Sequence, residues 1–155
     1  MPVADAPAHY APAQASAPAL HQAKARWDRL EIGVLRSVNR ARGRHGLPRL
    51  RLSRRISYIA GMHAADMARN RFISHSSSNG TPFNVRIRIV ENARTVGENL
   101  AAMRGRTTGR RVVRAWLRSP AHRAQVLDPR YRRIGVGRAT GSGTVFVTAD
   151  FASRR

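Results

Sequence analysis

The sequence predicts an α+β domain in which helices pack against a small antiparallel sheet. From Trp27 to Leu127 most apolar residues recur with the 3.6-residue spacing of helices, and after Ile134 they alternate as in strands. The tripeptide Gly141-Ser142-Gly143 separates two alternating stretches and indicates a hairpin turn. No segment repeats another, so we expect one unit of helices followed by strands.

The first helix is expected over residues 23–44, because its apolar residues share one face. They are Trp27, Leu30, Val34, Leu35, Val38 and Ala41. Gly43 and Gly46 are expected to end the helix, and Pro48 prevents a restart. Residues 1–22 are rich in Ala and Pro and lack apolar periodicity, so we expect a flexible leader before a single domain over 23–155. This leader has neither the basic start nor the apolar run of a signal peptide.

The second helix is expected to begin after Ser53, a favourable N-cap, and to end near Asn70. His63 lies in the middle of its apolar stripe, which is typical of a core histidine with a satisfied hydrogen bond. Residues 74–82 carry turn chemistry, and a short helix is expected over 83–90. Residues 95–100 are ambiguous between strand and loop.

Two further helices and the sheet follow. Thr107 or Thr108 caps a helix that runs through Leu117, and Ser119-Pro120 supplies the N-cap and first position of a helix over 120–127. In the first strand of the hairpin, Ile134 and Val136 alternate with glycines, which predicts that another element packs closely against that strand.

The chain is strongly basic, with 155 residues, 29 Lys+Arg, 8 Asp+Glu and a formal charge of +21. The charge has two interpretations: a surface for nucleic acid or an anionic cell-surface polymer, or a general use of arginine on a solvated surface. No aromatic residues are interleaved with the arginines as stacking platforms for single strands. We therefore expect nonspecific adhesion to nucleic acid and other polyanions at low salt.

The composition also excludes several classes of site and protein. The chain has no cysteine, which excludes disulfides, thiolate zinc sites and a cysteine nucleophile. No apolar run approaches the roughly 18 residues that a membrane-spanning helix needs.

Three residues stand out as candidates for chemistry: His75, Glu98 and His122. Glu98 lies between apolar neighbours, where a carboxylate needs a cation, hydrogen-bond donors or a metal. His75 lies in a tight polar loop, and His122 lies at the start of a helix, where the dipole disfavours a charged imidazole. Neutral imidazoles and a carboxylate are zinc ligands, so the three residues form a candidate ligand cleft or metal site.

Other interpretations of these residues stay open. Glu98 could instead belong to a structural hydrogen-bond network, or it could act as the general base of a metal-assisted hydrolase. A triad with Ser74 or Ser76 as nucleophile lacks an elbow motif and an oxyanion loop. Asn99 is expected to tie loop backbone together. Arg42 and Arg123 are expected partners for buried carboxylates.

The same residues lie in motif blocks that resemble the CAP superfamily, also called the SCP domain, in its cysteine-free bacterial branch. The blocks occur in the family's order across residues 30–151. They are Val38-Asn39-Arg40-Ala41-Arg42, Gly46-Leu47-Pro48, Ala64-Ala65-Asp66-Met67-Ala68, Phe72-Ile73-Ser74-His75-Ser76, Val96-Gly97-Glu98-Asn99-Leu100-Ala101, Trp116-Leu117-Arg118-Ser119-Pro120-Ala121-His122-Arg123, Ile134-Gly135-Val136-Gly137 and Asp150-Phe151.

The resemblance implies an α-β-α sandwich, an extracytoplasmic location, and a cleft lined by two histidines and two acidic residues. His75, Glu98 and His122 match three of these positions, whereas Ser119 stands near the place of the second acid. We therefore expect a secreted, non-enzymatic module whose cleft weakly binds a divalent cation such as zinc, or a small ligand. The alternatives are a metal-assisted hydrolase acting on peptide or cell-wall material, and an arginine-rich module that binds polyanions.

Overall fold

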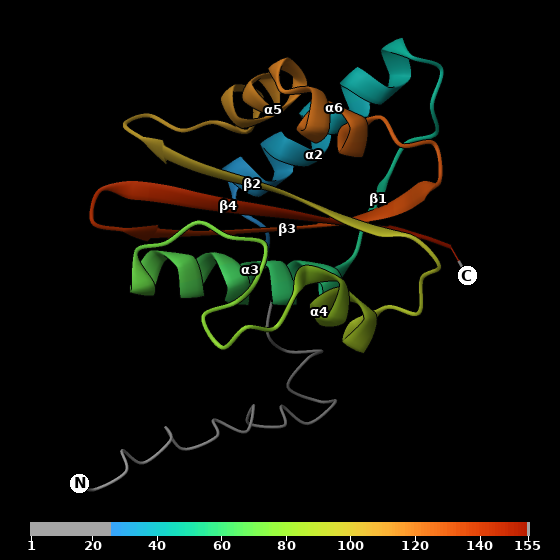
Figure 1. Ribbon diagram of the computed structural model, residues 1–155. Helices are drawn as coiled ribbons and strands as arrows, with labels where there is room; N and C mark the ends of the chain where they lie inside the picture. The colour runs from blue at the N-terminus through green and yellow to red at the C-terminus, as the bar shows by residue number, and fades with distance from the viewer. Residues whose placement is uncertain (1–25, 155) are drawn as a thin grey trace, which may run out of the picture.

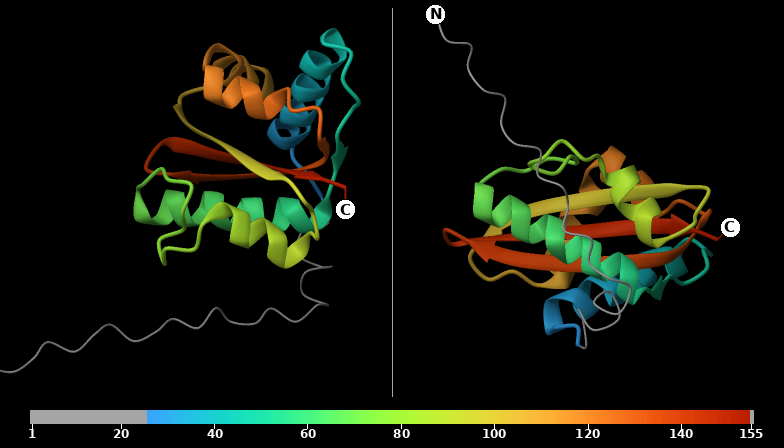
Figure 2. Two further views of the ribbon diagram at one scale, coloured as in Figure 1. Left: turned by 45° about the vertical axis from the view of Figure 1, so that its right-hand side comes forward. Right: turned by 90° about the horizontal axis from the view of Figure 1, so that it is seen from below.

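The computed structural model describes residues 26–154 and has three layers (Figure 1). One face of a central sheet carries α2 (Arg29–Arg44), α5 (Gly109–Arg118) and α6 (Pro120–Val126). The other face carries α3 (Arg54–Asn70) and α4 (Phe83–Val90), and the two further views show the same layering (Figure 2). The predicted α+β class and α-β-α sandwich are confirmed.

The sheet has four strands in the order β1-β3-β4-β2. The long hairpin of β3 (Tyr131–Gly141) and β4 (Thr144–Ser153) turns at the predicted residues, and β2 (Val96–Arg104) pairs antiparallel with β4. The sheet is nevertheless mixed rather than purely antiparallel, because β1 (Arg51–Leu52) pairs parallel with β3. Strand β1 has only two residues, which is too short to show an alternating pattern, so it is recognised only by its pairing with β3.

Helix α2 begins at Arg29 because Asp28 and Glu31 form a capping box. The Asp28 carboxylate accepts from the Glu31 backbone N–H at 2.9 Å, and the Glu31 carboxylate accepts from the Asp28 N–H at 3.0 Å. Trp27 precedes the helix, and its indole donates to Ser57 Oγ at 3.1 Å. The predicted start at residue 23 is therefore wrong: residues 26–28 are not helical, because the capping box fixes the start at Arg29. The predicted leader over 1–22 lies outside the described residues.

Helix α3 packs directly on β3, as the strand glycines predict. A Cβ added to Gly137 would lie 2.1 Å from the backbone nitrogen of Gly61, and one added to Gly135 would lie 2.3 Å from the carbonyl carbon of Ile56. No side chain fits between helix and strand at these points, so glycine permits the close approach.

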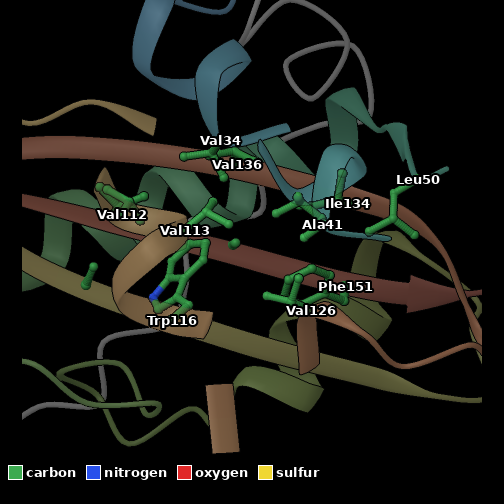
Figure 3. Close-up of a cluster of buried hydrophobic side chains, with 14 of the residues drawn as sticks. Val34, Ala41, Leu50, Val112, Val113, Trp116, Val126, Ile134, Val136 and Phe151 are labelled. Atoms are coloured by element: carbon green, nitrogen blue, oxygen red, sulfur yellow. The ribbon is translucent and has the colours of Figure 1, made fainter. Parts of the chain in front are cut away.

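The main hydrophobic core lies between the sheet and the layer of α2, α5 and α6 (Figure 3). Trp116 of α5 is buried there, and its indole donates to the Leu100 carbonyl oxygen at 2.8 Å. That bond fixes α5 above β2. The ambiguous segment 95–100 is thus mostly strand, and β2 forms one edge of the sheet.

Candidate functional site

Glu98 lies on the edge strand β2 with its side chain fully buried. His75 Nδ1 lies 2.8 Å from Glu98 Oε1, and Arg86 Nη2 donates to Glu98 Oε2 at 2.5 Å. Both carboxylate oxygens therefore have a partner, which offsets the cost of burying the charge. The structure thus brings together two of the three predicted site residues, His75 and Glu98.

Arg86 was missed by sequence reasoning. It lies in α4, and one of its guanidinium nitrogens also donates to the carbonyl oxygens of His75 and Thr81, each at 3.0 Å. Arg86 consequently holds the loop that carries His75 while its other nitrogen neutralises Glu98. A signal was present: Arg86 stands between Phe83 and Val90 on the apolar face of a short helix, where a cation needs a buried acid.

Asp150 was also missed. It lies opposite Glu98 in the β2–β4 pair and is completely buried. Burial raises the pKa of the Asp150 carboxyl well above its usual value, and the charge of Glu98 acts in the same direction. Asp150 is therefore the neutral member of this acid pair. The alternating sequence of the strand predicts that Asp150 lies on a polar face of the sheet. That face is buried because helices cover both sides of the sheet.

His75 has one ring nitrogen fixed and the other available. Because Glu98 accepts from Nδ1, this nitrogen carries a proton, and in the neutral form of the ring Nε2 carries the lone pair. The side chain is 54% exposed, and its ring lies 5.8 Å from that of Phe83 between centroids. The orientation of His75 is thus set by a buried carboxylate below and an aromatic ring beside it.

His122 approaches the same strand from α6, the helix layer on the opposite face. Its backbone oxygen accepts from Asn99 Nδ2 at 2.9 Å, so the Asn99 amide holds backbone as predicted, but it ties helix α6 to strand β2 rather than a loop. Burial lowers the pKa of the His122 imidazole, and the nearby charge of His75 lowers it further. The two rings consequently lie within electrostatic range of each other, and His122 is neutral near pH 7.

Ser119 supplies the ring partner of His122. Its hydroxyl lies 2.9 Å from His122 Nδ1. Ser119 has the backbone position of an N-cap for α6, as predicted, but its side chain makes no capping bond to that helix. The hydroxyl that stands near the place of the family's second acid therefore contacts a cleft histidine.

The arrangement offers two ring nitrogens rather than three direct metal ligands. Within residues 26–154 no group of three or more His, Cys, Asp or Glu side chains is placed to hold a metal ion. Glu98 reaches the ring of His75 and the guanidinium of Arg86 instead. Its position corresponds to the carboxylate–histidine pairs in which an acid orients a metal-binding ring.

The two predicted arginine partners of buried carboxylates are corrected. Arg42 is buried but donates to backbone oxygens only: Pro48, Val126 and Asp128 at 2.9 Å and Tyr131 at 3.4 Å. Arg123 is exposed, and its Nη2 lies 3.2 Å from His45 Nε2. The carbonyl oxygens at the end of α6 and in the following turn satisfy Arg42 without a carboxylate, and Arg86 takes the predicted role.

His63 and the serines support the loop that carries His75. His63 is buried, as predicted for a core histidine, and its Nε2 lies 2.7 Å from the Ser74 carbonyl oxygen. The Ser74 hydroxyl accepts from the Ser76 backbone N–H at 3.1 Å. Among the described residues neither Ser74 nor Ser76 has a histidine hydrogen-bonded to its hydroxyl, so the geometry gives a serine triad no support.

A three-layer α-β-α domain with two histidines at one edge of the sheet is the class that the sequence motifs imply. The sequence pattern described as "CAP: Cysteine-rich secretory protein family" matches residues 35–151. The chain belongs to the CAP family.

Curated relatives come from Bacillus subtilis. The chain is 33% identical over 108 residues to the uncharacterized protein YkwD, covering 69% of this chain and 41% of YkwD. It is 31% identical over 108 residues to the uncharacterized membrane protein YlbC, covering 69% of this chain and 31% of YlbC. The chain thus spans less than half the length of either relative. Among the described residues no helix is long and apolar enough to cross a membrane.

Solved structures share the fold. An outer surface protein from Borrelia burgdorferi superimposes with a TM-score of 0.70 at 25% identity, covering 79% of this chain and 90% of that one. An extracellular SCP-domain protein from Bacillus anthracis gives a TM-score of 0.68 at 28% identity, covering 81% and 41%. NaASP2, solved with Zn²⁺, gives a TM-score of 0.58 at 12% identity, covering 81% and 80%.

Proposed function

We propose that this chain is an extracellular, non-enzymatic binding module whose cleft at His75, Glu98 and His122 weakly binds a divalent cation or a small ligand. One observation carries the proposal: buried Glu98 accepts from His75 Nδ1, which leaves Nε2 as the remaining ring nitrogen, and the ring lies within electrostatic range of His122. Two imidazoles held by separate partners suit a borderline-soft cation such as zinc, which binds the neutral form of each ring.

The residues fit zinc as a two-nitrogen site. His75 and His122 would supply the ligands, while Glu98 and Ser119 hold the two rings through Nδ1. A zinc ion bound there supplies a positively charged centre that can accept water or an anionic group of a ligand. Two protein ligands are fewer than the three or four of tight zinc sites, which supports weak binding. The structure of NaASP2 with Zn²⁺ adds a precedent within the fold.

The buried state of Glu98 favours binding over hydrolysis. A general base needs a carboxylate oxygen within reach of a water or substrate proton. Both oxygens of Glu98 are bonded to His75 and Arg86, and the side chain is 0% exposed. Glu98 therefore acts on ring orientation and charge balance. The hydrolase alternative requires turnover of peptide or cell-wall material that is lost both on chelation and in Glu98→Gln.

An extracellular location fits the described neighbours, one an outer surface protein and one an extracellular protein. The charge of +21 would keep such a module close to anionic envelope polymers. If polyanion binding were the main role, retention on heparin or DNA would persist near about 0.15 M salt, whereas release below that concentration marks nonspecific attraction.

Calorimetric titration with zinc at about pH 7 tests the cleft. We expect a weak saturable heat for the parent chain and none for the double variant His75→Ala, His122→Ala. His45→Ala is the matched control, because His45 is exposed and its ring contacts the Ala41 carbonyl oxygen and Arg123 rather than the cleft. Equal heats in the parent and the double variant would remove the metal from the proposal.

A further inference from the structure

Helices α2 and α5 pack on the same face of the sheet (Figure 1). A groove of about 650 Å³ lies between them. The helices approach so closely at Gly33 and Gly109 that a Cβ on Gly109 would lie 2.1 Å from the Gly33 carbonyl carbon. Leu30, Val113 and Leu117 line the groove and join the core beneath it. We call this feature the α2–α5 groove; its floor is apolar.

All charged residues that line the α2–α5 groove are basic. Seven arginines line it and all are exposed, whereas no Asp or Glu lines it. Within residues 26–154 none of the seven forms an ion pair, since the acids of that range bond to other groups or face the core. The seven residues are Arg29, Arg36, Arg40, Arg44, Arg110, Arg114 and Arg118.

Six of these arginines form two regular rows. Each row repeats every fourth residue: 36, 40 and 44 on α2, and 110, 114 and 118 on α5. Four residues of helix advance about 6 Å along the axis, so each row presents a charge about every 6 Å. Like charges at this spacing repel one another. A partner with acidic groups at the same repeat would relieve the repulsion along both rows.

We infer that the α2–α5 groove docks an acidic amphipathic helix of a partner protein. Such a helix lays its apolar stripe on the floor, and its Asp or Glu side chains, repeating every three or four residues, meet the arginine rows on both rims. A flexible polyanion matches the rims but leaves the apolar floor in water. The groove extends roughly 22 Å from Arg29 to Arg44, the length of about four helical turns.

The inference goes beyond the proposed function, because the α2–α5 groove and the His75/His122 cleft share no residue. The two sites can be altered independently. Failure at the groove would leave the zinc titration unaffected, and the reverse also holds.

Fluorescence anisotropy with the full chain and labelled synthetic peptides in about 0.15 M salt tests the inference. The probe is an amphipathic peptide with a leucine stripe flanked by glutamates. The matched peptide has the same composition in scrambled order, which keeps the charge and destroys the stripe. We expect the striped peptide to bind at least about tenfold more tightly than the scrambled one.

Charge reversal locates the binding. Arg40→Glu with Arg114→Glu changes one arginine on each rim and should weaken binding of the striped peptide by about tenfold or more. Arg69→Glu with Arg94→Glu is the matched control, with the same change in net charge at two exposed residues that do not line the groove. The control should bind like the parent.

Several results would overturn the inference. Equal affinity for the striped and scrambled peptides, or for polyglutamate, would make the groove a plain polyanion surface. Equal losses of affinity for the striped peptide in both double variants would show that binding depends on net charge rather than on the groove. Groove-dependent binding of phosphatidylglycerol vesicles without binding of the striped peptide would replace the protein partner by a lipid surface.

Discussion

Glu98 and Asp150 face each other across the β2–β4 pair as two buried acids of which one is charged and one is neutral. Arg86 lies 2.5 Å from Glu98 and holds the negative charge there. The carboxyl group of Asp150 is the second buried acid, and burial raises its pKa and favours the protonated form. Beneath His75 the cleft of this CAP domain therefore has two buried carboxyl groups, of which only Glu98 has an arginine partner.

The neutral state of Asp150 predicts how stability depends on pH. The native chain keeps a proton that the unfolded chain releases above the ordinary carboxyl pKa of 3.8. The contribution of Asp150 to stability is thus fully present below that pKa and declines as pH rises toward the raised native pKa, with a slope of up to about 1.4 kcal/mol per pH unit. Asp150→Asn carries no such proton. Its stability relative to the parent, measured by urea unfolding, should increase from about pH 4 to pH 8. A constant offset across that range would show that Asp150 does not titrate in this way.

The ion pair of Glu98 and Arg86 predicts a large cost for Glu98→Gln. The substitution leaves a guanidinium that is only 10% exposed beside a neutral amide, and losing one partner of a buried pair costs about 3 kcal/mol. Urea unfolding should show this loss. Arg130→Ala removes a side chain that is 64% exposed from its pair with Asp128 and should change stability little. Similar effects of the two substitutions would contradict a buried, structurally required pair.

The coupling between the two cleft histidines can be measured by NMR titration of the His122 ring. Its pKa should lie below the ordinary value of 6.5, because burial disfavours the charged ring. His75→Ala should raise the midpoint partway toward 6.5, since it removes a nearby positive charge while burial remains. His45→Ala should leave the midpoint unchanged. An unaltered midpoint in His75→Ala would mean that the two rings do not share a cleft.

The close contact between α3 and β3 predicts opposite effects of alanine at two glycines. Gly137→Ala would place a Cβ 2.1 Å from the Gly61 backbone nitrogen, and the resulting displacement of α3 should cost about 3 kcal/mol. Gly43→Ala in α2 meets nothing within 4 Å and should stabilise the chain by about 0.5 kcal/mol through its helix propensity. Thermal and urea unfolding of both variants would check the pair. Tolerance of Gly137→Ala would contradict the packing of bare backbone on α3.

Much of the fold could be predicted because its signals are local. Helices α3 and α4 follow the bounds given by apolar periodicity and by turn residues, and the hairpin turn falls at Gly141 to Gly143. The short parallel strand β1 could not be predicted. Two residues have no period, and only their contact with β3 defines them.

The candidate site was predicted in part. His75 and Glu98 are bonded as the cluster required, and His122 lies within electrostatic range. Arg86 and Asp150 were missed, since each looks ordinary in its own segment: one is a basic residue in a helix, the other a polar residue in an alternating strand. Their roles arise from neighbours more than ten residues away in sequence.

By itself the sequence determined most element types, the family and the candidate residues His75, Glu98 and His122, because periodicity, capping and motif order are properties of neighbouring positions. Tertiary structure alone decided which charges are compensated. Folding places Arg86 beside buried Glu98 and buries Asp150 so that the protonated carboxyl is favoured. It also directs Arg42 to backbone oxygens. The arginines that line the α2–α5 groove have no acidic partner among residues 26–154. The physical reason is that the free energy of a charge depends on the burial and partners that folding brings to it, and these come from distant parts of the chain.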